Sequence, residues 1–254
     1  SRVNLIDATP IGVNVRSTVA TYSGVLDELR RAFARTEEAQ AAGLKPGAFS
    51  YNTGSLRCPT CDGTGQITLD VQFLPDVDIE CTECRGSRYG AQAASIRRDG
   101  LSLPDILAMS VDEARVAVRG LKKAGALLET LSGLGLGYLT LGEATPALSG
   151  GEAQRLKLAS EMGRRQDGAL FVFDEPTIGL HPDDVQVLLD VLQRLIERGA
   201  TVLVIEHDLD LIRCADWVID MGPGGGIEGG RIVAQGTPSD IAANEASVTG
   251  RYLR

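Results

Sequence analysis

The sequence predicts an α/β protein that carries a separate four-cysteine metal module. Two short apolar runs, 169–173 and 201–205, flank a segment with helical periodicity, which is the pattern of a strand–helix–strand unit. Two Cys-x-x-Cys pairs are separated by 19 residues, a spacing typical of structural zinc sites. The 254 residues are 43% apolar and 23% charged, which is the composition of a globular protein long enough to bury a core.

The chain begins on an apolar stretch, 3–6, that we expect to form a strand. Neither an initiator methionine nor a charged-then-apolar leader precedes it, so we expect the chain to be a segment of a longer protein. No apolar run approaches the roughly 18–20 residues that spanning a bilayer requires, which excludes a transmembrane helix.

The net charge of -9 is unevenly distributed along the chain. Residues 148–254 carry 10 Lys and Arg against 17 Asp and Glu, whereas residues 1–147 carry 15 against 17. Because an acidic protein repels a phosphate backbone, contact with nucleic acid would have to be local or be supplied by parts of the protein outside this chain. Within the chain, the nearly balanced first part is where such contact is possible. A solvated surface of mixed charge is the simpler explanation of the counts alone. The arginines around the cysteines are Arg57, Arg85, Arg88, Arg97 and Arg98.

The first cysteine pair is Cys58 and Cys61, and the second is Cys81 and Cys84. Each Cys-x-x-Cys turn directs two thiolates at one metal ion, so two such turns complete a tetrahedral site. Four thiolates leave no open coordination position, which favours a structural zinc ion over a catalytic metal. Two disulfides are the alternative, and the lack of a secretory signal argues against them.

Glycines follow both cysteine pairs, at Gly63, Gly65 and Gly86, and allow tight turns that direct N–H groups at sulfur. Between the pairs, residues 66–73 alternate polar and apolar, which predicts a strand, and 74–76 predict a turn. The fifth cysteine, Cys214, lies in an apolar helical stretch, where we expect a buried packing residue.

The run 169–173 predicts a buried parallel strand that ends in Asp174 and Glu175. Open α/β sheets bind their ligands at this end of their strands. Nucleotide hydrolysis uses such a pair, with one carboxylate for Mg²⁺ and one to polarise the attacking water. A helix cap or a surface turn explains two acids at this place equally well.

A helix is predicted from Pro182 to Gly199, because proline, two acids and then leucines at helical spacing follow one another. The second strand, 201–205, is followed by Glu206, His207 and Asp208. The two histidines of the chain, His181 and His207, each follow one of the two strands, which favours a function beside bound phosphate.

Two further segments complete the predicted elements. Ser149 and Glu152 predict a capping box at the start of a helix. Gly150 and Gly151 would leave the first-turn amides uncovered, and a bare helix N-terminus binds phosphate, although a capped helix without a ligand is the simpler interpretation. Segments 217–221 and 230–235 flank a glycine-rich turn and predict a hairpin.

These motifs, in this order, resemble those of ABC-type ATPases. Residues 148–152 are similar to the signature motif, 170–175 to the Walker B strand with its catalytic glutamate, and 177–181 to the D-loop. His207 resembles the switch histidine. A zinc module between the Q-loop region and the signature helix narrows the resemblance to the C-terminal half of the UvrA excinuclease family. Further matching stretches are 10–12, 20–24, 57–58, 73–77 and 135–138, so the resemblance covers nearly the whole chain.

The resemblance implies a function for each motif. Asp174 would hold Mg²⁺ through water, Glu175 would act as the general base, and His207 would contact the γ-phosphate of ATP. The signature residues would contact the γ-phosphate of an ATP held by another half of the protein. The residues implied in nucleotide binding are Ser149, Gly150, Gly151, Glu152, Asp174, Gly179 and His207. The zinc module would shape a DNA-contacting surface with Arg57, Arg85 and Arg88 at its edge.

The resemblance also implies the setting of the protein. It predicts a cytoplasmic homodimer that binds DNA and a UvrB-like partner, without membrane association, and with structural Zn²⁺ and ATP with Mg²⁺ as cofactors. It divides the chain into a Q-loop region (1–30), an inserted region with the zinc module at 58–84 (31–147), and the signature helix with the C-terminal ATPase core (148–254).

Three departures from the family pattern stand out. No Gly-x-x-x-x-Gly-Lys-Ser/Thr loop occurs, so we expect this Walker A loop upstream and expect the chain alone to be inactive. Ala8 stands where the family usually has a glutamine that helps hold Mg²⁺. Segments 12–16 and 17–19 lack the family's usual Arg- and Asn-Pro-containing pattern. Together these predict a UvrA-like paralogue.

We therefore expect a UvrA-like ATPase that couples ATP hydrolysis to damage recognition in nucleotide excision repair. One alternative is a paralogue that gives resistance to DNA-binding drugs, and another is a non-repair ABC-type binding module. A third is a chaperone-like module, because Cys58-x-x-Cys61-x-Gly63-x-Gly65 is similar to DnaJ zinc repeats. The signature and Walker B motifs argue against this third alternative.

Overall fold

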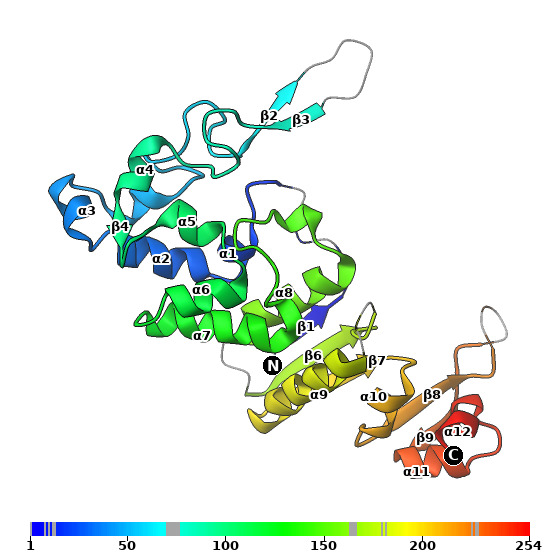
Figure 1. Ribbon diagram of the computed structural model, residues 1–254. Coiled ribbons are helices and arrows are strands. Elements are labelled where there is room, and N and C mark those ends of the chain that lie inside the picture. The colour runs from blue at the N-terminus through cyan, green and yellow to red at the C-terminus, as the bar shows by residue number, and fades with distance from the viewer. Residues whose placement is uncertain are drawn as a thin grey trace. The chain divides into compact units, whose positions relative to one another are not determined.

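The chain forms two compact units in the computed structural model (Figure 1). The sheet unit comprises residues 1–7 and 168–254, and the helical unit comprises residues 8–167. The structure describes residues 2–7, 9, 11, 14–69, 77–162, 167–178, 180, 182–224, 226 and 229–254, with the backbone alone at 182–184.

The sheet unit is built on three parallel strands in the order β1–β6–β7. These are β1 (Arg2–Ile6), β6 (Ala169–Asp174) and β7 (Thr201–Ile205), which confirms the three predicted strands. Ile6 lies opposite Phe173, and Asp174 lies opposite Ile205. The carboxyl ends of the strands therefore meet at one edge of the sheet, as parallel pairing requires.

Helix α9 (Pro182–Glu197) connects β6 to β7 and confirms the predicted strand–helix–strand unit. It lies along these two strands (Figure 1), and its Leu188, Leu192 and Leu195 are buried. Phe171 and Phe173 stack with their ring centroids 6.4 Å apart and are also buried. The alternate residues of the sheet leave apolar side chains exposed, namely Val3, Leu5, Leu203 and Ile205.

The predicted hairpin is present downstream as the antiparallel pair of β8 (Val218–Gly222) and β9 (Arg231–Gly236). Three short helices accompany it, α10 (Leu209–Arg213), α11 (Pro238–Ala243) and α12 (Val248–Leu253). The prediction that Cys214 is buried is wrong. Cys214 is the C-cap residue of α10, where the helix ends and the chain turns, and its side chain is exposed.

The helical unit packs short helices around a core of aromatic and leucine side chains, among them Phe33, Phe49, Leu128 and Leu131. Its α-helices are α1 (Val19–Tyr22), α2 (Val25–Phe33), α3 (Glu37–Ala41), α4 (Ala91–Ser95), α5 (Leu103–Leu107), α6 (Val111–Ala117), α7 (Lys122–Leu131) and α8 (Gly150–Met162). Its shorter helical turns are η1 (Pro46–Phe49), η2 (Ser132–Leu136) and η3 (Thr145–Ala147).

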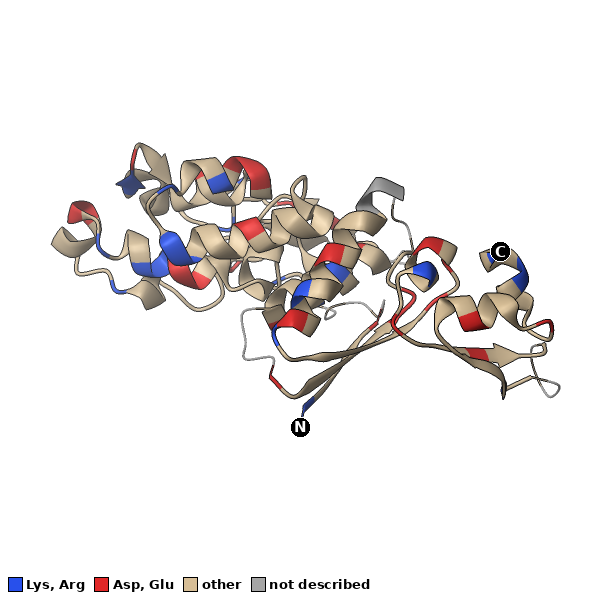
Figure 2. Ribbon diagram, turned by 90° about the horizontal axis from the view of Figure 1, so that it is seen from below, with Lys and Arg blue, Asp and Glu red and all other residues tan. Residues whose placement is uncertain are grey.

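Two small hairpins complete the helical unit, β2 (Gln66–Leu69) with β3 (Val77–Glu80), and β4 (Arg97–Arg98) with β5 (Leu101–Ser102). The predicted strand 66–73 is confirmed over β2, and its remainder and the predicted turn at 74–76 lie outside the described residues. Lys and Arg alternate with Asp and Glu over the helices of this unit (Figure 2). None of the described helices is long and apolar enough to cross a membrane.

Candidate metal centre and nucleotide site

The four predicted cysteine ligands converge in the helical unit. The sulfur atoms of Cys58, Cys61, Cys81 and Cys84 all lie within 4.8 Å of one another, and all four side chains are buried. The Sγ–Sγ distance is 3.9 Å between Cys58 and Cys81 and 3.6 Å between Cys61 and Cys84. All four thiols are free, so the alternative of two disulfides is not formed.

The spacing of these sulfur atoms fits a tetrahedral metal site. With a Zn–S bond of about 2.3 Å, the edge of a regular tetrahedron is about 3.8 Å. The N–H of Gly65 donates to Cys61 Sγ at 3.3 Å, as the glycine spacing predicts. Four thiolates this close repel one another strongly unless a cation lies between them, so the cluster can hold a metal ion.

The acidities of two thiols differ because their surroundings differ. Burial by itself would raise the pKa of the Cys61 thiol. Hydrogen bonds from the N–H of Gly65 and from the neighbouring thiols outweigh burial and lower this pKa to about 7. Burial raises the pKa of Cys84 to about 12, and its thiol neighbours add to this rise while the N–H of Arg88 opposes it. The two thiols thus share one coupled environment, and metal binding would require both to lose their protons.

Arg88 is not at the surface, which corrects its prediction as a DNA-contacting residue. Its relative exposure is 7%, and its Nη1 donates to the Val15 carbonyl at 2.9 Å. The guanidinium carbon lies 5.2 Å from the centroid of the Tyr51 ring. A buried arginine with these partners holds the module to the preceding chain and cannot reach a phosphate backbone.

The other two predicted arginines keep some exposure. Arg85 is exposed. Arg57 is partly exposed, but its Nη2 pairs with Asp62 at 2.9 Å and its Nη1 donates to the Asn52 carbonyl at 3.1 Å. Arg16 pairs with the other oxygen of Asp62 at 3.0 Å. One carboxylate thus holds two guanidinium groups at the edge of the module.

In the sheet unit, the predicted catalytic residues lie at the carboxyl edge of the sheet. Asp174 ends β6 with an exposed side chain, and the N–H of Glu175 donates to the Ile205 carbonyl at 2.9 Å. Glu175 has a φ of 47°, a left-handed conformation that is uncommon for residues other than glycine. Backbone strain of this kind is often found at functional sites.

The two loops that follow β6 and β7 bring the predicted base and switch histidine together. His207 Nδ1 lies 3.9 Å from Glu175 Oε1 and 3.8 Å from Glu206 Oε2. The side chain of His207 is 76% exposed and that of Glu175 is 45% exposed, so both can meet a ligand, whereas that of Glu206 is 2% exposed. Sequence reasoning gave no function to Glu206, because one acid after a strand carries no periodic signal.

The predicted capping box is formed at the start of α8. The N–H of Ser149 donates to Glu152 Oε2 at 2.6 Å, and the N–H of Glu152 donates to Ser149 Oγ at 3.3 Å. Ser149 and Gly150 are exposed, and Gly151 is buried. The capping box therefore leaves Ser149 and Gly150 accessible to solvent.

Tyr138 adds a contact that sequence reasoning missed. Its hydroxyl donates to the second oxygen of Glu152 at 2.5 Å. Burial raises the pKa of Glu152, but the hydrogen bonds from Tyr138 and Ser149 hold it below its ordinary value. Arg155, one turn along α8, is buried, and its Nε and Nη1 have no hydrogen-bond partner among the described residues. Both Tyr138 and Arg155 thus lie beside the carboxylate that caps the helix.

Three positions of the predicted site lie outside the described residues. They are Gly179 and His181 of the predicted D-loop and Ala8, which replaces the family's glutamine.

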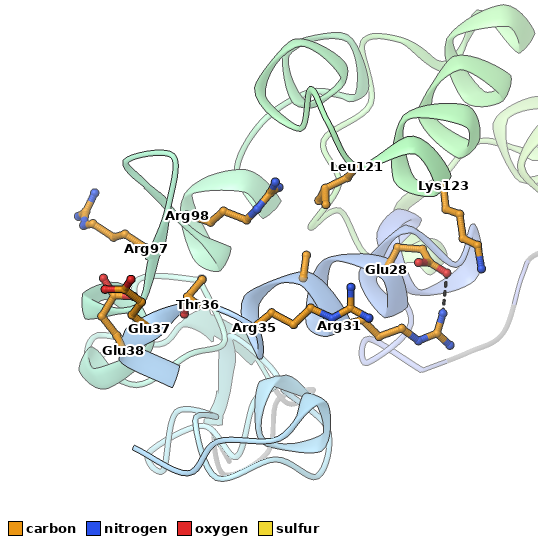
Figure 3. Close-up of a pocket in the computed structure, with 11 residues that line it drawn as sticks. Glu28, Arg31, Arg35, Thr36, Glu37, Glu38, Arg97, Arg98, Leu121 and Lys123 are labelled. Atoms are coloured by element: carbon orange, nitrogen blue, oxygen red, sulfur yellow. Dashed lines mark hydrogen bonds and ion pairs between the residues drawn. The ribbon is translucent and has the colours of Figure 1, made fainter. Parts of the chain in front are cut away.

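The helical unit also contains a cation-lined pocket of about 700 Å³ (Figure 3). Its basic lining residues are Arg31, Arg35, Arg97, Arg98 and Lys123, and its acidic ones are Glu28, Glu37 and Glu38. Arg31 pairs with Glu28 at 2.5 Å at the end of the pocket that holds Lys123, while Glu37 and Glu38 lie at the Arg97 end (Figure 3). Five cations against three carboxylates give the pocket a net positive charge in an acidic protein.

The parallel sheet with Asp174 and Glu175 at its edge and the capped Ser-Gly-Gly-Glu helix place the chain in the class of ABC-type ATPases, with a four-cysteine module inserted. No protein-family model matches the chain. The chain is 50% identical over 250 residues to the UvrABC system protein A of Aquifex aeolicus. The aligned region covers 98% of this chain and 27% of that protein. It is 50% identical to the Bacillus subtilis protein of that name over 98% of this chain and 26% of the relative.

A solved structure gives the same result. The crystal structure of UvrA2 from Deinococcus radiodurans superimposes with a TM-score of 0.93 at 44% identity, over 100% of this chain and 31% of that one. The chain is therefore a segment of a UvrA-type protein, and it spans about a quarter of the length of its curated relatives.

Proposed function

We propose that this chain supplies the Walker B strand, the switch histidine and a signature helix of a UvrA-type ATPase that acts on DNA in nucleotide excision repair. The observation that carries the proposal is the proximity of Glu175 and His207 at the carboxyl edge of the sheet, where Glu175 Oε1 lies 3.9 Å from His207 Nδ1. Asp174, the last residue of β6, directly precedes Glu175. Nucleotide hydrolysis on such sheets needs carboxylates at this edge.

Each of these residues has a distinct task. Asp174 would hold Mg²⁺, which neutralises charge on the phosphates of ATP. Glu175 is partly exposed and would accept the proton of the attacking water. His207 is largely exposed and would contact the γ-phosphate as a donor. The phosphate-cradling loop would come from a part of the protein outside this chain.

The start of α8 would serve a second nucleotide. The exposed Ser149 and Gly150 would contact the γ-phosphate of an ATP held by another half of the protein, with Gly151 and Glu152 shaping the turn. Donors at a helix N-terminus favour an anion because the helix dipole adds to their partial charge. Gly179 would belong to the D-loop, because residues 177–181 resemble that motif of ABC-type ATPases.

The proposal is tested in the full-length protein with the change Glu175→Gln. This variant should lose ATP hydrolysis, about 10²-fold or more, while it still binds ATP, because an amide cannot accept the proton of water. Glu197→Gln on α9, an exposed glutamate, is the matched control and should keep wild-type turnover. Undiminished turnover in Glu175→Gln would contradict the assignment of the base.

We propose that the four cysteines hold a structural zinc ion. The support is their spacing, their burial and their thiol-only chemistry, which favours zinc over oxygen-ligated metals. A closed four-sulfur site leaves no position for substrate, so its function would be to fix the module.

The surface that we propose for DNA binding is wider than the edge of the four-cysteine module, because it includes the cation-lined pocket. The cation-lined pocket supplies five basic groups on one side of the helical unit, and the exposed Arg85 adds one at the module. Phosphate groups are bound by such clusters without reading of sequence. Through its relatives the protein would also form a homodimer in the cytoplasm and bind a UvrB-like partner.

A further inference from the structure

Glu206 differs from the other acids at the carboxyl edge of the sheet, because its side chain is almost fully buried. It follows Ile205, the last residue of β7, and its side-chain exposure is 2%. A buried carboxylate is costly unless its oxygens receive several hydrogen bonds. Its hydrogen bonds therefore indicate what the protein gains from this residue.

Both oxygens of Glu206 are used, and each receives bonds from a different loop. Oε1 accepts the N–H of Thr177 at 2.8 Å and also the Thr177 hydroxyl. Oε2 accepts the N–H of His207 at 2.8 Å and the N–H of Asp208 at 3.1 Å. Thr177 belongs to the loop after β6, and His207 belongs to the loop after β7.

All four partners are donors, which only a carboxylate can satisfy. Burial raises the pKa of Glu206, but these hydrogen bonds hold the pKa below its ordinary value. The backbone N–H groups at 177, 207 and 208 cannot reverse to become acceptors. Glutamine has the same shape but only one acceptor atom, so it would leave one loop facing an NH₂ group.

The two loops carry the groups proposed for catalysis. Glu175 lies two residues before Thr177, and His207 is itself bonded to Glu206 through its backbone. The 3.9 Å distance between Glu175 and His207 thus depends on how the two loops are held, and among the described residues Glu206 is bonded to both. Asp208 in turn caps α10, since its Oδ1 accepts the N–H of Leu211 at 2.9 Å.

We propose that Glu206 is a positioning residue that ties the loop after β6 to the loop after β7, and so sets Glu175 and His207 for hydrolysis. The inference rests on the proposed ATPase function. It predicts that loss of this tie lowers turnover far more than it lowers nucleotide binding, because Glu206 itself is buried away from the ligand.

The test compares three variants of the full-length protein for kcat, KM and equilibrium binding of ATP. Glu206→Gln should lower kcat about 10- to 100-fold with the Kd for ATP within about threefold of wild type, since small misplacements of reacting groups have effects of this size. Thr177→Val removes only the hydroxyl donor and should lower kcat less, in the same direction. Glu197→Gln should change neither quantity.

Amide hydrogen exchange checks that the effect passes through the loops. In Glu206→Gln, peptides that contain 175–178 and 206–208 should exchange faster, while peptides of α9 should not change. An unchanged kcat in both Glu206→Gln and Thr177→Val would overturn the proposal. So would a loss of kcat that parallels a loss of nucleotide-binding stoichiometry in both variants. A wild-type protein without ATPase activity would instead overturn the proposed function, together with this inference.

Discussion

Arg88 has the backbone conformation of a glycine. In the first half of the module, Cys58-x-x-Cys61-Asp62-Gly63-x-Gly65, residues 62, 63 and 65 have positive φ. The second half, Cys81-x-x-Cys84-Arg85-Gly86-x-Arg88, repeats the pattern with arginine at the last position, where φ is 71°. A left-handed conformation costs such a residue about 1–2 kcal/mol. The hydrogen bond to Val15 and the contact with Tyr51 offset this cost.

We expect Arg88→Met to loosen the module. The change removes a hydrogen bond from a charged donor, which contributes about 1.5–3 kcal/mol, and the cation–π contact. Metal loss to a chelator should become about tenfold faster, measured on full-length protein with a metal-sensitive dye. Arg85→Met is the matched control, because Arg85 also has positive φ but is exposed. Equal rates in both variants would contradict the structural function of Arg88.

Single residues mark the limit of what the sequence could predict. The cluster of four cysteines and the capping pair of Ser149 and Glu152 follow from short spacings, so both could be predicted before the fold. Arg88 and Cys214 could not be placed, because their burial depends on distant residues and on where a helix ends. Tyr138 and Glu206 act through contacts that no local pattern records.

At the scale of elements, the four-cysteine module is a small unit with little apolar core of its own. Its buried cluster consists of the cysteines, with Ile67 of β2 packed against them. The hairpin of β2 and β3 is exposed along most of its length. The metal ion proposed for the four cysteines would hold such a module together, because the module buries too little apolar surface to be stable without one.

We expect about one zinc ion per chain, bound by the four thiols. Cys84→Ser should lower the zinc content of purified full-length protein to about the background level and make 57–89 sensitive to protease. Cys214→Ser, which changes an exposed cysteine outside the cluster, should keep both the zinc and the resistance to protease. Full zinc content in Cys84→Ser, measured by elemental analysis, would exclude the four-sulfur site.

Periodicity explains which elements could be predicted. The strands β6 and β7, the helix α9 and the hairpin of β8 and β9 have clear apolar patterns and sharp ends, and the sequence predicts them. The helices α3 to α6 are too short for a pattern to emerge, at five to seven residues each. Capping boxes fix the starts of α5, with Ser102 and Asp105, and of α6, with Ser110 and Glu113. The functional domain boundaries stay a prediction.

At the scale of the whole molecule, charge is separated along the chain. The protein has a net charge of -9, yet the cation-lined pocket gathers five basic residues in the helical unit. Lys123 is the lysine of this pocket and lies beside the pair of Glu28 and Arg31 (Figure 3). A local positive region allows contact with phosphate although the chain as a whole is acidic.

We expect Lys123→Ala to weaken DNA binding in a salt-dependent way. Loss of one phosphate contact should reduce the slope of log K against log salt by about 0.9 for duplex DNA, with equal effect on all sequences. Lys45→Ala, an exposed lysine of the same unit that does not line the pocket, should leave the slope unchanged. Fluorescence anisotropy of full-length protein at several salt concentrations measures both, and equal slopes would exclude the pocket from the DNA-binding surface.

The pairing of β1 with β6 has a consequence for synthesis. Val3 and Leu5 leave the ribosome well before their partner strand, which starts only at residue 169. At about 5–20 residues per second, the ribosome needs roughly 10–30 s to deliver that partner. The helical unit lies between them in the sequence, so it is synthesised before β6 and can fold while β1 is still unpaired. We therefore expect the yield of the native sheet to depend on the translation rate and on chaperone protection of β1 while it is unpaired.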